Sequence, residues 1–297
     1  MSKNLYQQRR RSLSGIQSAN LDDAQLRALI GELLDAGIHG LSFSPYVEGQ
    51  GPGTQLTTDQ IKQRLAIIAP HVRWVRTFAC TDGHELIPAI AKERGIKTMV
   101  GVWIDDDTER NEIELATAID IAKAGHADIV AVGNEVMLRG ELSEDRLISY
   151  INRVREAVPD VPVGYVDAYF KFVDHPAVTE ACDVILANCY PFWEGYPAEH
   201  VLAYMKDMYW RARNAANGKP VIISETGWPD KGTPTEAAQP SRRNAMTYFI
   251  NAYQWAEQDN IDIIYFSAFD EAWKIQDEGD VGAYWGLWDA DGNPKYT

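Results

Sequence analysis

Eight short runs of apolar, largely β-branched residues recur along this chain of 297 residues, and segments with helical spacing separate them. Residues 24–34 and 147–156 are two of these segments, in which apolar residues fall on one face of a helix. Such runs are typical of parallel strands buried on both faces. Eight alternating units predict a (β/α)8 TIM barrel, an α/β fold whose site gathers at the C-terminal strand ends. The runs cover residues 40–46, 72–79, 97–104, 128–135, 162–169, 183–192, 220–228 and 261–273.

The chain is predicted to form one domain. A (β/α)8 barrel typically needs about 250 residues, and 45% of this chain is hydrophobic, which is enough for a large core. No repeat or linker divides the sequence, so residues 1–297 are expected to be a single compact catalytic domain with a flexible polar tail at 1–12. Its three cysteines, Cys80, Cys182 and Cys189, have no metal-type spacing and are predicted to be packed thiols.

Charge and motif content exclude several classes of function. A formal net charge of -15 argues against a nucleic-acid partner, because phosphate binding needs a basic face. The six histidines never pair at metal-ligand spacing, so no metal and no cofactor is expected. No membrane-length apolar stretch or signal peptide is present, and the protein is expected to be soluble and monomeric. Its compartment is left open: secreted or periplasmic if a signal peptide was removed, otherwise cytoplasmic.

Two glutamates stand at the C-terminal ends of predicted strands. Glu135 ends the run 129–135, and Glu225 follows the run 221–224 and precedes Gly-Trp-Pro. A carboxylate at such a position faces the barrel mouth. Alone, either residue could be a strand-end group in a salt bridge. Together they are what glycoside hydrolysis requires, one acid for the leaving oxygen and one nucleophile or base for the anomeric carbon.

Other strand ends carry aromatic and polar side chains. A pyranose ring presents hydroxyls at its rim and C–H groups on its faces, so a sugar site combines hydrogen-bonding groups with flat aromatic walls. Any one Trp could equally pack in the core. The predicted substrate-binding residues are Tyr46, Arg76, Trp103, Asn134, Tyr169, Tyr190, Phe192, Trp193, Trp228, Glu271, Trp273 and Lys274.

The chain resembles glycoside hydrolase family 17, the β-1,3-glucanases and related transglycosylases, as a bacterial-type member. The resemblance implies a retaining TIM-barrel enzyme with Glu135 as acid/base and Glu225 as nucleophile. It also implies that Asn134 binds the sugar 2-hydroxyl, that Tyr190 lies beside the nucleophile, and that Glu271 and Lys274 form a charged pair that orients the acid/base region. The matching segments are residues 43–46, 75–78, 132–136, 188–192, 224–229, 269–274 and 284–288.

One departure from the family pattern concerns an acidic residue. Many members carry an acid shortly before the Trp-Gly-Leu segment, whereas this chain has Gly282 in the run 281–284. Glu278 and Asp280 lie nearby, and the sequence does not decide whether either replaces the missing acid.

The resulting hypothesis is a hydrolase that cleaves β-1,3-glucan, such as laminarin, with an endo pattern favoured. The nearest alternative is a β-1,3-glucanosyl or glucosyl transferase, in which a sugar hydroxyl accepts the intermediate. A glycan-binding barrel without catalysis is more remote. A barrel lyase or aldolase would use Lys274, the only Lys among the strand-end residues, as a Schiff base.

Overall fold

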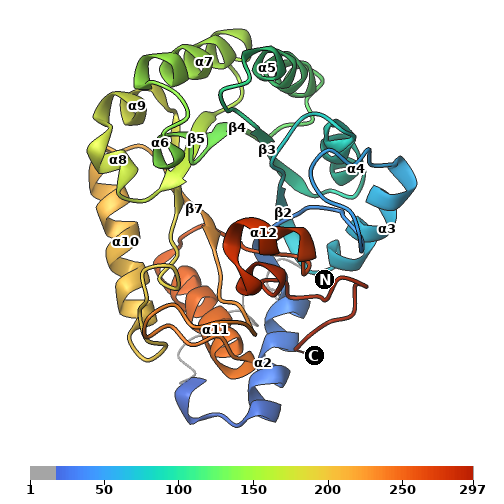
Figure 1. Cartoon of the computed structure of the whole chain (residues 1–297), viewed down its shortest axis with the longest axis vertical. Helices are drawn as coiled ribbons and strands as arrows, with labels where there is room; N and C mark the ends of the chain where they lie inside the picture. The colour runs from blue at the N-terminus through green and yellow to red at the C-terminus, as the bar shows by residue number, and fades with distance from the viewer. Residues whose placement is uncertain (1–17, 297) are drawn as a thin grey trace.

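The computed structural model describes residues 18–296, and its centre is a closed barrel of eight parallel strands in sequential order (Figure 1). The predicted TIM barrel is therefore confirmed. The predicted tail at residues 1–12 lies outside the described residues. The strands are β1 (Ile38–Ser42), β2 (Val72–Arg76), β3 (Lys97–Val102), β4 (Ile129–Asn134), β5 (Val163–Ala168), β6 (Val184–Asn188), β7 (Val221–Thr226) and β8 (Ile263–Tyr265).

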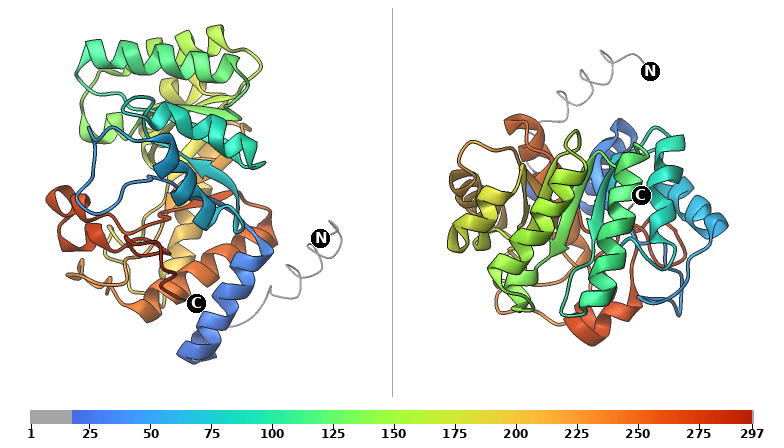
Figure 2. Two further views of the ribbon diagram at one scale, coloured as in Figure 1. Left: turned by 90° about the vertical axis from the view of Figure 1, so that its right-hand side faces the viewer. Right: turned by 90° about the horizontal axis from the view of Figure 1, so that it is seen from above.

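Helices surround the barrel, as the two views of Figure 2 show, and eight of those in the described part of the chain form the ring given below. Seven of them follow strands β1 to β7, and α2 precedes β1 and packs against α11. Thus α2 occupies the position that a helix after β8 would take. Its start is fixed by a capping box between Asp22 and Gln25. The ring consists of α2 (Asp23–Ala36), α3 (Thr58–Ile68), α4 (Ile87–Glu93), α5 (Thr108–Lys123), α7 (Glu144–Ala157), α9 (Pro176–Ala181), α10 (Val201–Ala215) and α11 (Arg242–Asp259).

Several strands are shorter than the apolar runs that predicted them. The run 261–273 contributes only the three residues of β8, and the run 183–192 leaves the sheet after Asn188. The remaining residues form loops at the C-terminal end of the barrel. Short elements in these loops and beyond β8 are α6 (Val136–Arg139), α8 (Lys171–Asp174), η3 (Ala272–Lys274), α12 (Ile275–Glu278) and η4 (Asp280–Ala283).

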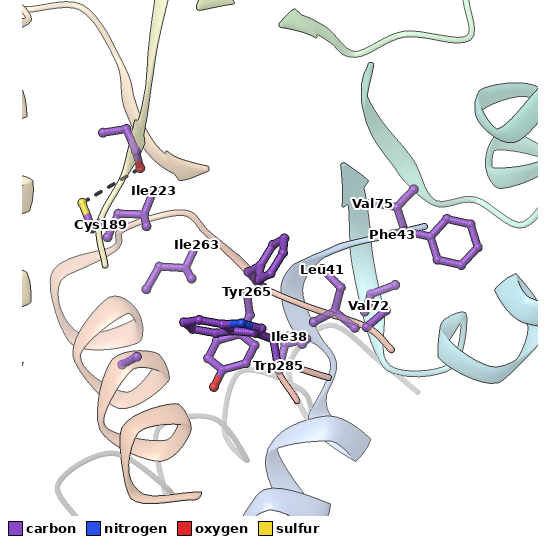
Figure 3. Close-up of a cluster of buried hydrophobic side chains, with 14 of the residues drawn as sticks. Ile38, Leu41, Phe43, Val72, Val75, Cys189, Ile223, Ile263, Tyr265 and Trp285 are labelled. Carbon is purple, nitrogen blue, oxygen red and sulfur yellow. Dashed lines mark hydrogen bonds between the residues drawn. The ribbon is translucent and has the colours of Figure 1, made fainter. Parts of the chain in front are cut away.

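Strand alternation divides the core into two layers. In β6, Val184 and Leu186 belong to a small apolar cluster, whereas Ile185 and Ala187 belong to the large one that includes the helices. Successive strand residues point to opposite faces, so the small cluster fills the barrel and the large one fills the space beneath the helices. Figure 3 shows part of the large cluster, in which Tyr265 of β8 and Trp285 of the segment after η4 are labelled.

All three cysteines are free and buried, which confirms the prediction of packed thiols. Within residues 18–296, no helix is long and apolar enough to cross a membrane. The same range contains no group of three or more His, Cys, Asp or Glu side chains that could hold a metal ion.

Trp228, just beyond β7, belongs to the large cluster. Its ring packs against Phe192 and Tyr248 at centroid distances of 5.2 and 5.6 Å, and its indole N–H donates to the Gln239 carbonyl at 3.1 Å. We expect Trp228→Ala to lower the free energy of unfolding by about 3–5 kcal/mol, because it leaves a cavity. Urea unfolding of the variant and of the wild-type protein measures this difference in free energy. Trp210, which is 48% exposed, is the control, and an equal effect of Trp210→Ala would contradict the assignment.

Candidate active site

Local backbone irregularities place the two glutamates. Gly133 has φ 88°, and a Cβ there would approach Val136 to 3.0 Å. Glu135 follows with φ 54°, and its N–H donates to the Val166 carbonyl at 2.8 Å. The β4–β5 pairing shifts register at this point, and so does the β6–β7 pairing beside Glu225. Such bulges redirect side chains beside functional sites.

Glu225 is held by two donors. Arg76 of β2 forms an ion pair with its Oε1, and the Tyr190 hydroxyl donates to its Oε2 at 2.6 Å. Burial and the charge of Glu225 keep the pKa of Tyr190 well above its usual value, so the phenol stays protonated and remains a donor. Glu225 is itself only 6% exposed. These contacts stabilise an ionised carboxylate and fix its orientation.

Arg76 also joins the strands that position the two glutamates. Its second terminal nitrogen donates to Asn134 Oδ1 at 2.7 Å, so one guanidinium bridges β2, β4 and β7. The predicted residues Arg76, Asn134, Tyr190, Glu135 and Glu225 are thereby brought together. Because Asn134 Oδ1 accepts from Arg76, the amide nitrogen is the group of this side chain that can donate to a ligand.

Glu135 has a different environment. Its Oε1 accepts from Asn188 Nδ2 at 2.9 Å, and Asn188 Oδ1 accepts from Ser224 at 2.9 Å. Burial raises the pKa of Glu135 to about 7, with a further contribution from the charge of Glu225. The Asn188 hydrogen bond and the charge of Arg139 oppose this shift. The carboxyl group of Glu135 therefore carries its proton below about pH 7.

The segment after β8 supplies a second charged group. Lys274 Nζ lies 3.4 Å from Glu271 Oε2, and the Trp273 indole donates to Glu271 Oε1 at 3.0 Å. The ammonium of Lys274 lies 4.2 Å from the ring centroid of Phe266. Glu271 and Lys274 therefore form the predicted pair. Burial and the charge of Glu271 raise the pKa of Tyr46. The Tyr46 hydroxyl forms a hydrogen bond with the His84 ring at 2.9 Å.

Three of the predicted tryptophans remain partly open. Trp193 is 39% exposed, and Trp103 and Trp273 are half-buried. Trp193 packs against Trp285 at 5.5 Å, and Trp285 packs against Tyr190 at 5.5 Å. Packed aromatic rings thus connect Tyr190, which donates to Glu225, with the exposed indole of Trp193. Trp103 stacks beneath the Arg139 guanidinium at 4.9 Å, close to Glu135.

The structure corrects three predicted substrate-binding residues. Phe192 and Trp228 are 0% and 1% exposed and pack in the core, so neither can form an open wall. Tyr169 turns toward α10, where its hydroxyl accepts from Arg211 at 3.0 Å and meets Tyr204 at 3.4 Å. Beyond the last ladder hydrogen bond, strand alternation no longer decides which way a side chain points.

Sequence reasoning missed Asn188 as a site residue. It is the last residue of β6, and its amide connects Glu135 to Ser224, the residue before Glu225. Its place in the matching segment 188–192, two residues before Tyr190, was the available signal. Arg139 was also missed. It lies one helical turn after Glu135, and spacing along the short helix α6 indicates this proximity.

Comparison with known proteins identifies the family of this chain. The family model described as the BtgE/BtgC glycoside hydrolase domain matches residues 40–286, which includes all eight strands except the start of β1. The match therefore extends from the first strand to the Trp285 segment beyond the barrel.

Individual relatives show the same likeness. A glucan 1,3-β-glucosidase of Arthroderma benhamiae is 31% identical over 76% of this chain and 80% of that protein, and one of Saccharomyces cerevisiae is 28% identical over 82% and 86%. The solved structure of a family 17 β-1,3-glucanosyltransferase from Rhizomucor miehei is 30% identical, with a TM-score of 0.77, and covers 87% of this chain and 95% of that chain. The chain therefore belongs to the BtgE/BtgC glycoside hydrolases, within glycoside hydrolase family 17.

Proposed function

We propose that this protein is a retaining β-1,3-glucan hydrolase that works by double displacement with Glu135 and Glu225. One observation carries the proposal: the two carboxyl groups lie in environments that favour opposite protonation states. Arg76 and Tyr190 donate to Glu225, whereas burial keeps a proton on Glu135. A retaining glycosidase needs this difference between its nucleophile and its acid.

In the first step, Glu225 attacks the anomeric carbon while the proton of Glu135 moves to the glycosidic oxygen. The C1–O bond breaks, the reducing-end fragment leaves as an alcohol, and a glucosyl ester forms on Glu225. In the second step, Glu135 takes a proton from water, and the hydroxide formed displaces Glu225 at C1. In this proposal Asn134 donates to the sugar 2-hydroxyl, a contact that strengthens in the transition state.

The substrate class follows from the family together with the site. The relatives named above are glucan 1,3-β-glucosidases, and this chain spans more than two thirds of each. A relative named as a glucan endo-1,3-β-glucosidase, btgC of Emericella nidulans, is 25% identical and supports the endo pattern. We infer that the protein acts as a monomer on β-1,3-glucan and uses neither a cofactor nor a nucleic-acid partner.

A glucanosyltransferase is the second candidate. The Rhizomucor miehei structures are described as β-1,3-glucanosyltransferases, and the first step is common to both activities. Product sizing over time on linear laminari-oligosaccharides separates them. Products longer than the starting chain indicate transfer, whereas only shorter products indicate hydrolysis.

Azide rescue tests the roles of the two glutamates. Glu225→Gly removes the nucleophile, so azide with an activated aryl β-glucoside should give the α-glycosyl azide. Glu135→Ala should slow turnover of poorly activated substrates by about 10²- to 10⁴-fold and, with azide, give the β-glycosyl azide. Glu93→Ala, at an exposed position on α4, is the control. Exchanged stereochemistry would exchange the roles, and full activity of either variant would refute the proposal.

The pKa of Glu135 predicts the alkaline limb of the activity profile. Because its raised pKa is about 7, the acid form is present below pH 7 and is lost above it. We expect kcat/KM on laminari-oligosaccharides to fall as pH rises through about 7. With a leaving group that needs no protonation, Glu135→Gln should lack this limb. A limb that persists unchanged in Glu135→Gln would show that another group supplies the proton.

Trp193 is expected to stack on a glucosyl unit away from the bond that is cleaved. Trp193→Ala should raise KM for long oligosaccharides about 2- to 10-fold, with kcat and the pH profile nearly unchanged, because stacking contributes contact but no proton. Trp210→Ala, at a similarly exposed residue on α10, is the control. An unchanged KM in Trp193→Ala would show that Trp193 does not contribute to substrate binding.

A further inference from the structure

The backbone that carries Glu135 has an uncommon conformation. Its φ of 54° lies in the left-handed region, which residues with a Cβ seldom adopt. The helix α6 that follows has only four residues, too few to be stable by itself. Such a conformation persists only where surrounding contacts hold it. The adjacent strand β5 supplies those contacts.

Two buried side chains of β5, Tyr165 and Asp167, bind the backbone of α6. The Met137 N–H donates to the Tyr165 hydroxyl oxygen at 2.8 Å, and the Leu138 N–H donates to Asp167 Oδ2 at 3.3 Å. The Tyr165 hydroxyl donates to the same carboxyl oxygen. Asp167 Oδ1 accepts from the Ala168 N–H at 2.7 Å, so both oxygens of this carboxyl group are fixed.

These contacts replace the usual cap of a helix. The N–H groups of the second and third helical residues are normally bound by the side chain of the residue before the helix. Here that residue is Glu135, whose side chain makes no such bond and instead accepts from Asn188 of β6. Because Tyr165 and Asp167 satisfy both N–H groups, the carboxyl group of Glu135 need not fold back onto α6.

The Tyr165 ring is itself held in place. Phe172 of α8 packs against it edge-on at a centroid distance of 6.1 Å. On β4, a Cβ built on Gly133 would lie 3.3 Å from the ring, so this glycine leaves the space that the ring needs. Burial and the charge of Asp167 raise the pKa of Tyr165 well above its usual value, so the phenol keeps its proton.

We propose that Tyr165 and Asp167 are positioning residues, which cap α6 in place of Glu135 and thereby aim the carboxyl group of Glu135 at the glycosidic oxygen. The inference rests on the proposed role of Glu135 as the acid/base. Neither side chain touches a reacting atom. Both act through the backbone of Met137 and Leu138, which continues directly from Glu135.

Tyr165→Phe is the decisive variant. It removes the hydroxyl, which is present whether or not Asp167 is ionised, and keeps the ring that packs on Phe172. We expect kcat/KM on laminari-oligosaccharides to fall by about 10-fold, because departure of a sugar alcohol needs a well-placed acid. With an activated aryl β-glucoside, kcat/KM should stay within about twofold, because this leaving group needs no proton and Glu225 is undisturbed.

Two further variants complete this test. Tyr253→Phe is the control, since it removes a buried hydroxyl that donates to the Gly40 carbonyl at 3.1 Å on the opposite side of the barrel. It should keep both kcat/KM values. Asp167→Asn, which cannot accept from Leu138 and Tyr165 together, should repeat the selective loss. Equal losses on both substrates in Tyr165→Phe, or no loss on either, would overturn the proposal. If one of the two β5 variants does not fold, the other decides.

A measurement without substrate distinguishes failure of this inference from failure of the proposed function. Amide hydrogen exchange, followed by NMR, reports directly on the N–H groups of α6. The Met137 amide should exchange at least about 10-fold faster in Tyr165→Phe than in the wild-type protein, whereas the amides of β6 should not change. Unchanged exchange at Met137 would refute the capping contact. If exchange rises as expected but the wild-type protein cleaves neither substrate, only the proposed function fails.

Discussion

The site depends on one buried guanidinium. Arg76 pairs with Glu225 and donates to Asn134, so a single side chain fixes the spacing of β2, β4 and β7 at the barrel mouth. A buried charge is costly unless it is paired and hydrogen-bonded, and the two contacts satisfy both terminal nitrogens. Lysine could not replace it, because a point charge lacks the planar fork that reaches a carboxylate and an amide together.

The eight-stranded barrel and the glutamate pair were predictable from the sequence, because both follow from strand periodicity. Apolar runs define the strands, and strand ends define the mouth. Side-chain direction beyond the strands was not predictable. Trp228 and Asp230 follow Glu225 closely, yet Trp228 turns into the helix layer and Asp230 pairs with Lys295 at 3.0 Å. The burial of Glu278 could not be predicted either, because the four-residue helix α12 is too short for a repeating pattern that would identify its buried face.

Two buried carboxyl groups at the barrel mouth cost stability as the pH rises. Glu135 and Glu278 both have pKa values raised from 4.5 to about 7, chiefly by burial, so the folded state binds their protons more tightly than the unfolded state does. Their contribution is most favourable below pH 4.5 and is lost as pH rises through 7. The other two buried carboxylates of the site are paired with positive charges, Glu225 with Arg76 and Glu271 with Lys274.

The barrel closes along a short seam. β1 and β8 pair at only two positions, Gly40 with Ile264 and Leu41 with Tyr265, whereas β5 and β6 pair at five. Packing of α2 on α11 and the Arg243–Asp23 ion pair reinforce this seam from outside. Local unfolding should therefore begin there, and backbone amides of β8 should exchange their hydrogens before those of β5. Since the segment after β8 carries Glu271 and Lys274, such opening would dismantle one side of the site while most of the barrel remained folded.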